Sequence, residues 1–289
     1  MAASLFKRHI AIPQDHGSWV FILSPLLIGL FAGQRLEAES AWLIVAAMGV
    51  FLLRQPVSIA VKAYSGRRSR ADLPAARFWM LVYGTLILLA LAGLITGGYA
   101  YTLFLAVPGL PVFAWHLWLV KKRAERRQAG VEILASGTLA LAAPAAFWIG
   151  RGEYHPLGWV LWLGVWLQSA ASIVYAYLRL EQRDMPIAQG RLQQGGPVPG
   201  PERSGLWRMG RRAFAYTSFN LVLALVLSGT SILPRWLFVP YLLQWVETLW
   251  GIFHPAIGWK AVNIGLRQLF VSALWTALFI ITWSLSWTK

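Results

Sequence analysis

The chain has 289 residues, of which 57% are hydrophobic and 13% are charged. A soluble globular domain carries about 25% charged residues, so this composition excludes an ordinary soluble protein. The net charge of +15 would suggest nucleic acid as the partner of a soluble protein, but the positive-inside rule for membrane proteins accounts for it, and we expect no nucleic acid. The absence of cysteine excludes disulfides, thiol catalysis and thiolate metal sites.

Apolar segments follow one another along the chain, each close to the ~20 residues that a helix needs to cross a bilayer. The alternating pattern of a membrane β-barrel is absent, so helices must satisfy the backbone in lipid. The segments are residues 17–33, 41–63, 77–96, 101–120, 131–150, 157–178, 214–231, 236–253 and 262–287. They predict an all-α polytopic transmembrane helical bundle of about nine spans, organised as one transmembrane domain over residues 1–289.

The cations are distributed unevenly between the two sides of this predicted arrangement. With the N-terminus in the cytosol, most of the 26 Lys and Arg residues fall in cytosolic connections. Arg54 lies within a span, and the other side receives only Arg35, Arg151, Arg235 and Lys289. This bias predicts a cytosolic N-terminus. If residues 236–253 did not span, the C-terminus would lie in the cytosol as well.

Two further patterns describe the connections and the ends of the spans. Residues 181–212 are rich in Gly and Pro and predict a flexible cytosolic loop, too small to fold alone. Tryptophans near the span ends are typical of the headgroup level; they are Trp79, Trp148, Trp159, Trp236, Trp259 and Trp287. Inside the spans, Gly29-x-x-x-Gly33 and Gly93-x-x-x-Gly97 predict close helix packing.

The first span opens with Pro13-Gln14-Asp15-His16-Gly17-Ser18-Trp19. Asp15 can cap the helix and complement its dipole, and Trp19 fits the headgroup belt. That interpretation leaves His16 unexplained. Because ionisable residues in membrane segments are costly and usually functional, Asp15 and His16 are candidate ligand-binding residues.

Arg54 is the most unusual residue of the second span. Lys62 marks the cytosolic end of that span, so Arg54 lies eight residues deeper, or roughly 12 Å at 1.5 Å per residue. Lys62 can extend to the interface, whereas Arg54 needs a partner, a wet cavity or an anionic ligand. An internal ion pair with Glu247 or Glu132 is the alternative to a ligand-binding role.

Other polar residues lie at the same end of their spans. Glu132 opens the fifth predicted span, where it suits the helix dipole. Glu247 lies within a span, and Arg267 is a plausible partner for it across a short turn. Tyr175 and Arg179 share a helical face that suits a phosphate or carboxylate, although residues of the headgroup belt show the same pattern. These five residues, with Asp15, His16, Arg54 and Lys62, form the predicted ligand-binding set.

No metal or cofactor is predicted. The five histidines show no spacing typical of a metal site, and the sequence contains no Gly-rich phosphate loop and no nucleophile elbow.

Three elements of the first two spans resemble the YwiC-like family of bacterial membrane proteins. They are Pro13-x-x-His16-Gly17-x-Trp19, Ser24-Pro25-Leu26-Leu27-Ile28-Gly29-Leu30 and Arg54-Gln55-Pro56. The family carries Glu before the histidine, so Asp15 is a conservative departure. The resemblance implies a multi-pass protein of the bacterial cytoplasmic (inner) membrane and assigns it no activity.

A more distant resemblance is to the UbiA-type intramembrane prenyltransferases, based on the number of spans and a polar cavity at the cytosolic face. Those enzymes hold a prenyl diphosphate through magnesium bound to two Asp-rich motifs. In this chain the corresponding stretch after the second span is basic and has only Asp72 as an acid, and the second position has only Glu181 and Asp184. The resemblance therefore implies the fold without the magnesium-dependent chemistry, and whether the chain is an enzyme stays open.

These patterns predict a protein that binds an isoprenoid or another anionic amphiphile in a cytosol-facing intramembrane cavity. The headgroup would lie near Arg54, Lys62, Asp15 and His16, and the bilayer is the other expected partner. Three alternatives stay open: a prenyltransferase with degraded Asp-rich motifs, a transporter with Arg54 at its substrate site, and an assembly or scaffold subunit of a membrane complex.

Overall fold

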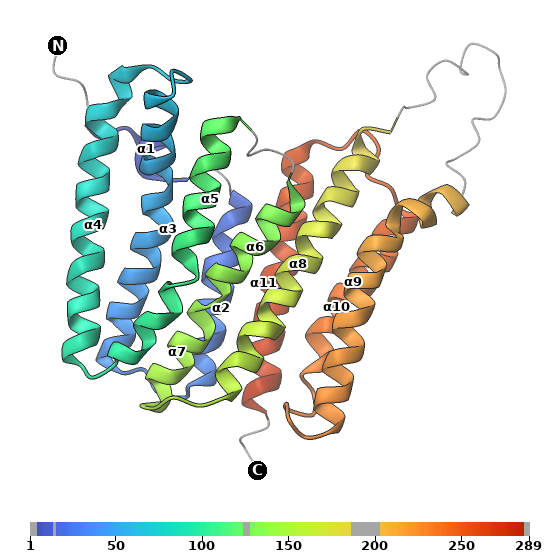
Figure 1. Cartoon of the computed structure of the whole chain (residues 1–289). Helices are drawn as coiled ribbons and strands as arrows, with labels where there is room; N and C mark the ends of the chain where they lie inside the picture. Colours follow the sequence, from blue (N-terminus) through green and yellow to red (C-terminus); the bar gives the residue numbers. More distant parts are fainter. Residues whose placement is uncertain (1–4, 14–15, 124–127, 186–202, 286–289) are drawn as a thin grey trace, which may run out of the picture. The chain divides into compact units, whose positions relative to one another are not determined.

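The computed structural model describes residues 5–13, 16–123, 128–185 and 203–285. The regular elements within these ranges are all helices (Figure 1). The chain folds into two compact units, Met1–Val165 and Trp166–Lys289, and the division between them falls within one long helix, α8.

The first unit begins with short helices and continues with long apolar ones. In chain order they are α1 (Arg8–Ala11), η1 (His16–Trp19), α2 (Val20–Ala32), α3 (Ala38–Tyr64), η2 (Arg70–Asp72), α4 (Leu73–Thr96), η3 (Ala100–Ala106), α5 (Gly109–Lys122), α6 (Ala129–Ala140) and α7 (Ala142–Arg151). Helix α3 packs along α4, and α2 packs against α6 and α7. The first part of α8 (Leu157–Arg183) completes the unit.

The second unit contains the rest of α8 and three further helices, α9 (Arg203–Gly229), α10 (Phe238–Phe253) and α11 (Ala261–Ser284). Helix α10 packs against both α9 and α11.

Each of the predicted spans corresponds to a helix or to a consecutive pair of helices. Among the described residues, seven helical segments are long and apolar enough to cross a membrane. Two predicted spans correspond to shorter helices: Gly17–Ala32, and α10 with 16 residues. A helix of 16 residues is about 24 Å long, less than the ~30 Å of the hydrocarbon core. The prediction of an all-α, multi-pass membrane protein is confirmed.

Proline explains why two predicted spans are interrupted. The segment 101–120 is divided between η3 and α5, and the break falls at Pro108, which starts a new helix instead of continuing one. The segment 131–150 is divided between α6 and α7 at Leu141. Pro144 has no N–H to donate to the carbonyl of Ala140, so the α-helical ladder is broken there.

The predicted loop at 181–212 is helical at both of its described ends. Helix α8 continues to Arg183, and α9 begins at Arg203 rather than at Phe214. Arg, Leu and Met are good helix formers, so a span continues into the polar region until Gly and Pro accumulate. Residues 186–202, which contain most of that Gly and Pro, lie outside the described residues, and the flexibility of this stretch stays a prediction.

Close packing at the two glycine pairs is confirmed. A Cβ atom at Gly33 in the first unit would lie 2.9 Å from the Cα of Gly150, and one at Gly29 would lie 2.7 Å from the Cβ of Ala146. The second pair packs against α3, where Gly93 contacts the ring of Trp42 and Gly97 contacts Glu39. These approaches bring helix backbones together as small residues do in membranes.

Trp148 differs from the predicted belt residue. It is completely buried, and its indole N–H donates a hydrogen bond of 2.7 Å to the carbonyl of His155. Rings of Tyr154 and Trp159 surround it. Trp236 and Trp259, by contrast, are exposed, and their place at the headgroup level stays a prediction.

The N-terminal segment is fixed across α3 and α4. Ile10 is fully buried and packs with Ile59, Ala60 and Ala76. Three side chains of α3 and α4 donate hydrogen bonds to carbonyls of this segment: Gln55 to His9 (3.0 Å), Trp79 to Leu5 (3.1 Å) and Tyr83 to Ala11 (2.9 Å). The carboxylate of Asp72 binds Lys7 and Arg68 at 2.8 and 2.7 Å. This docking places the start of the first predicted span beside α3.

Candidate functional site

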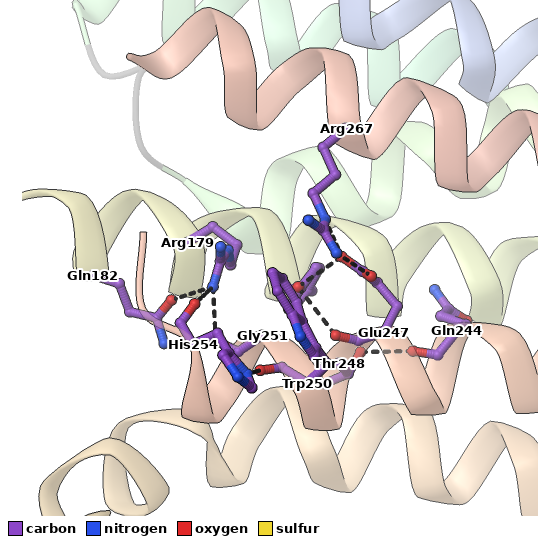
Figure 2. Close-up of polar contacts among 10 residues, drawn as sticks. Arg179, Gln182, Gln244, Glu247, Thr248, Trp250, Gly251, His254 and Arg267 are labelled. Carbon is purple, nitrogen blue, oxygen red and sulfur yellow. Dashed lines mark hydrogen bonds and ion pairs between the residues drawn. The ribbon is translucent and has the colours of Figure 1, made fainter. Parts of the chain in front are cut away.

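Four of the predicted ligand-binding residues come together in the second unit. Glu247 of α10 and Arg267 of α11 form a two-pronged ion pair, with the Nε of Arg267 at 2.7 Å from one carboxylate oxygen and an Nη at 2.8 Å from the other (Figure 2). The hydroxyl of Tyr175, on α8, donates to the same carboxylate at 3.0 Å. The predicted pairing of Glu247 with Arg267 is therefore present.

Trp250 supports this ion pair from α10, three residues after Glu247. The guanidinium of Arg267 lies 3.9 Å from the centre of its ring, and the ring of His254 stacks on it at 4.7 Å. A cation held against an indole face is stabilised by the ring electrons. The Glu247 side chain is 11% exposed and that of Arg267 is 33% exposed, so the pair lies at the edge of the packed helices.

Arg179 binds the C-terminal end of α10. It is buried, and one Nη donates to the carbonyls of Gly251 (2.7 Å) and His254 (2.6 Å) and to the side chain of Gln182 (2.9 Å) (Figure 2). These carbonyls belong to the C-terminal end of α10, where a helix leaves carbonyls without intrahelical partners and where a cation is favoured. Arg179 is therefore a cap for α10 and not a residue of the headgroup belt.

Sequence reasoning missed Gln182 and Trp250. Gln182 is fully buried and donates from Nε2 to the carbonyls of Gly251 (3.1 Å) and Ile252 (3.4 Å), although it lies in the predicted flexible loop. Its position three residues after Arg179 places both on one helical face, which is the signal that the sequence offered. Nothing in the sequence distinguished Trp250 from the other tryptophans of the chain.

In the first unit, residues from two of the three sequence elements that resemble the YwiC-like family contact the same ring, that of Phe51. The ring of Trp19, from the first element, meets the ring of Phe51 edge-on at 5.1 Å. The guanidinium of Arg54, which belongs to the Arg54-Gln55-Pro56 element, lies 5.5 Å from the centre of the same Phe51 ring. Phe51 is 2% exposed, and Arg54 is partly buried. Arg54 is therefore held against a fixed aromatic pair in the middle of α3.

Further cations gather at the end of α3. Lys62 lies in the last turn of that helix. Arg67 follows it and donates a hydrogen bond to the carbonyl of Val120, near the C-terminus of α5. That contact brings the connection after α3 to the end of α5, where Lys121 and Lys122 are exposed. Several positive charges of the first unit are thus concentrated at one end of it.

The remaining predicted residues are less informative. Glu132 is exposed in the first turn of α6, where its charge complements the helix dipole. His16 begins η1, and Asp15 lies outside the described residues. Within the described parts of the chain, no group of three or more His, Cys, Asp or Glu side chains is placed to hold a metal ion.

Comparisons with known proteins agree with the motif-based resemblance. Residues 12–147 match the family described as YwiC-like protein, a range that runs from the end of the N-terminal segment into α7 and includes Arg54. The chain is also 23% identical over 267 residues to the protein named "Uncharacterized protein YwiC" of Bacillus subtilis (strain 168), covering 89% of this chain and 92% of that relative. The predicted resemblance to the YwiC-like family is confirmed. No solved structure matches the chain, and the UbiA-like arrangement stays a prediction.

Proposed function

We propose that this multi-pass membrane protein binds an anionic amphiphile, an isoprenoid or another lipid with a phosphate or carboxylate headgroup. The position of Arg54 carries the proposal, because this cation lies in the middle of an apolar helix, against the Phe51–Trp19 pair. In this view Arg54 and Lys62 bind the headgroup, and Asp15 and His16 complete its surroundings.

The cost of placing arginine in a membrane supports a ligand-binding role. A charged side chain near the bilayer centre costs about 2.5–3.5 kcal/mol on insertion scales, and such residues usually mark a functional path or site. The planar guanidinium donates two parallel hydrogen bonds to a phosphate or carboxylate, which lysine cannot do. Phe51 holds one part of Arg54 in place and so reduces the entropy lost when a headgroup binds.

The depth of Arg54 favours an amphiphile over a soluble anion. Its Cα is eight residues, or roughly 12 Å, along α3 from that of Lys62, which lies in the last turn. A headgroup drawn toward Arg54 leaves its tail beside apolar helix surfaces, where burial of each CH₂ contributes about 0.8 kcal/mol. The exposed Lys121 and Lys122 add a positive field at the entrance that attracts anions.

The second unit contributes less to this proposal. Glu247 and Arg267 bind each other there, and Arg179 binds backbone carbonyls of α10. We place the headgroup site at Arg54 and Lys62 because both lie on α3, within the range that matches the family.

Native mass spectrometry of gently extracted protein tests this proposal. The wild type should carry a nearly stoichiometric anionic lipid or isoprenoid, and Arg54→Ala should lower its occupancy about tenfold or more, because a charge-assisted hydrogen bond contributes about 1.5–3 kcal/mol. Arg54→Lys should retain part of the binding. Arg35→Ala removes an exposed cation from the connection between α2 and α3 and should change nothing. Equal lipid content in wild type and Arg54→Ala would contradict the proposal.

We also propose that the N-terminus lies in the cytosol of a bacterium and that the spans cross its inner membrane. The chain contains no cysteine, so single cysteines report their own side of the membrane without background. An impermeant maleimide added to intact spheroplasts should label Glu153→Cys, in the exposed turn after α7. Ser69→Cys, in the exposed turn after α3, should be labelled only after the membrane is opened. The reverse pattern would invert the orientation.

A further inference from the structure

Helices α8 and α10 of the second unit run parallel and in register. Ser172 contacts Gln244, Tyr175 contacts Glu247 and Arg179 contacts Gly251, and each pair is separated by 72 residues. A constant separation along two helices means that they run in the same direction. The α8 residues of this contact face, Gln168, Ser172, Tyr175 and Arg179, recur at intervals of four, three and four residues, as the core positions of a coiled coil do.

Almost every residue on this contact face is polar. We call it the polar seam, defined by Gln168, Ser172, Tyr175 and Arg179 of α8 and by Gln244, Glu247 and Gly251 of α10. Polar side chains do hold membrane helices together, and several hydrogen bonds here do so. Gln244 donates from Nε2 to the carbonyl of Gln168 and to the hydroxyl of Ser172, both at 3.0 Å. Gln168 donates from its own Nε2 to that hydroxyl at 3.0 Å.

Two buried acceptors remain after these hydrogen bonds are counted. Gln244 Oε1 and Asn220 Oδ1 have no hydrogen-bond partner in the described part of the chain. The two residues are 6% and 2% exposed. Asn220, on α9, donates from Nδ2 to the carbonyl of Leu167 at 2.9 Å, so the two amides bind carbonyls of adjacent α8 residues. The hydrogen bonds between helices use the N–H groups of both amides but leave both amide oxygens without a donor.

The chemistry of these two oxygens selects the ligand. A buried acceptor without a donor is costly, and such groups in native proteins are generally satisfied by ordered water. An anion would be repelled by two carbonyl-type oxygens. A metal cation is disfavoured because Arg179 and Arg267 already place positive charge along the same contact face. Water donates twice and accepts twice, and so matches a group of acceptors beside a serine hydroxyl.

We propose that ordered water enters the polar seam beside Arg267 and Glu247 and that it reaches Gln244 and Asn220. Arg267 is one-third exposed and meets the seam at Glu247, between its two buried ends. From Glu247 and Tyr175 it is one helical turn to Gln244 and Ser172. Figure 2 shows Arg267, Glu247 and Gln244 along this direction. The seam is then a hydrated half-path through part of the membrane. This inference is independent of the proposed headgroup site.

Silver-ion accessibility of single cysteines tests it in reconstituted full-length protein. Ag⁺ binds thiols, is small, and enters wet polar paths but not hydrocarbon, and the cysteine-free wild type supplies the blank. Ser172→Cys reports on the seam, and Ser169→Cys reports on its border, where the Ser169 hydroxyl donates to Oε1 of Gln168 at 3.5 Å. Both changes keep nearly the same side-chain volume. Ser204→Cys, exposed in the first turn of α9, is the reactive control. Val222→Cys is the dry control, because Val222 is 58% exposed on the α9 span, two residues from Asn220.

Ser172→Cys should bind Ag⁺ about a hundredfold faster than Val222→Cys and should approach the rate of Ser204→Cys. The reason is that Ag⁺ must leave water and enter hydrocarbon to reach residue 222, which is unfavourable. Ser169→Cys should follow Ser172→Cys, so one misfolded variant does not decide the outcome. If both react as slowly as Val222→Cys while Ser204→Cys reacts quickly, the seam is dry and the inference is wrong.

Discussion

Replacing Glu247 with leucine should lower the free energy of unfolding by about 3 kcal/mol, the lower end of the range for breaking a buried ion pair. The substitution leaves the guanidinium of Arg267 beside Trp250 without its carboxylate. It also removes one of the two acceptors of the Tyr175 hydroxyl, which keeps the backbone carbonyl of residue 247 at 3.2 Å. The effect falls at the lower end because the Arg267 side chain is one-third exposed and retains some contact with its surroundings.

A double-mutant cycle separates this ion pair from general disruption. Arg267→Met removes the cation, and the double variant Glu247→Leu with Arg267→Met should be more stable than the sum of the two single effects by about 1.5 kcal/mol or more. Denaturant unfolding in mixed micelles, followed by circular dichroism, measures each corner of the cycle. Strictly additive effects would show that the two side chains do not stabilise each other.

Replacing Arg179 with methionine should also cost about 3 kcal/mol, because each buried acceptor left without a donor costs about 1–3 kcal/mol. The carbonyl of His254 and the side-chain oxygen of Gln182 lose the donor that Arg179 supplies. The carbonyl of Gly251 keeps the hydrogen bond from Gln182, which limits the loss. The same unfolding measurement applies.

Arg183→Met is the matched control, one turn further along α8. Arg183 is partly exposed and pairs with the exposed Asp184, so its removal should change stability by less than about 0.5 kcal/mol. Arg179→Lys should recover little, since a single ammonium cannot reproduce the planar geometry of a guanidinium. Equal effects of Arg179→Met and Arg183→Met would contradict the capping role.

The helical segments were predictable because each is set by a local property of the chain. A long apolar run must be helical in lipid, so all nine segments correspond to helices even where Pro108 or Pro144 interrupts them. The boundaries were less predictable, as α9 shows by starting at Arg203. A helix ends where capping and backbone preference stop it, and not where the hydrophobic run stops.

In the candidate sites, a contact was predictable from the sequence only where a charged side chain requires a partner of opposite charge. Glu247 must find a cation near the same depth, and Arg267 was the nearest across a short turn. Arg179 looked identical to a headgroup-level cation, because its partners are backbone carbonyls that no sequence pattern marks. Trp148 was misassigned to the membrane interface for a similar reason: a buried indole that donates to a carbonyl has the same sequence context as an exposed one.

The contacts of Trp19 and Arg54 with Phe51 show that the tertiary structure brings separate sequence motifs to one place. The two elements are about thirty residues apart in the chain, and their sequences alone do not place them together. The N-terminal segment docks on α3 and α4 through Gln55 and Tyr83, and Trp19 then meets Phe51 of α3. The proposed headgroup site depends on that arrangement.

Photo-crosslinking in proteoliposomes tests the proposed headgroup site most directly. An anionic isoprenyl phosphate probe with a photoreactive group beside its phosphate would be activated on wild type and on Arg54→Ala, and the modified peptides would be mapped. We predict labelling concentrated on the peptides that contain Trp19, Phe51 and Lys62, and its loss in Arg54→Ala. Labelling spread evenly over lipid-facing helices, and unchanged by the substitution, would contradict an anionic amphiphile at Arg54.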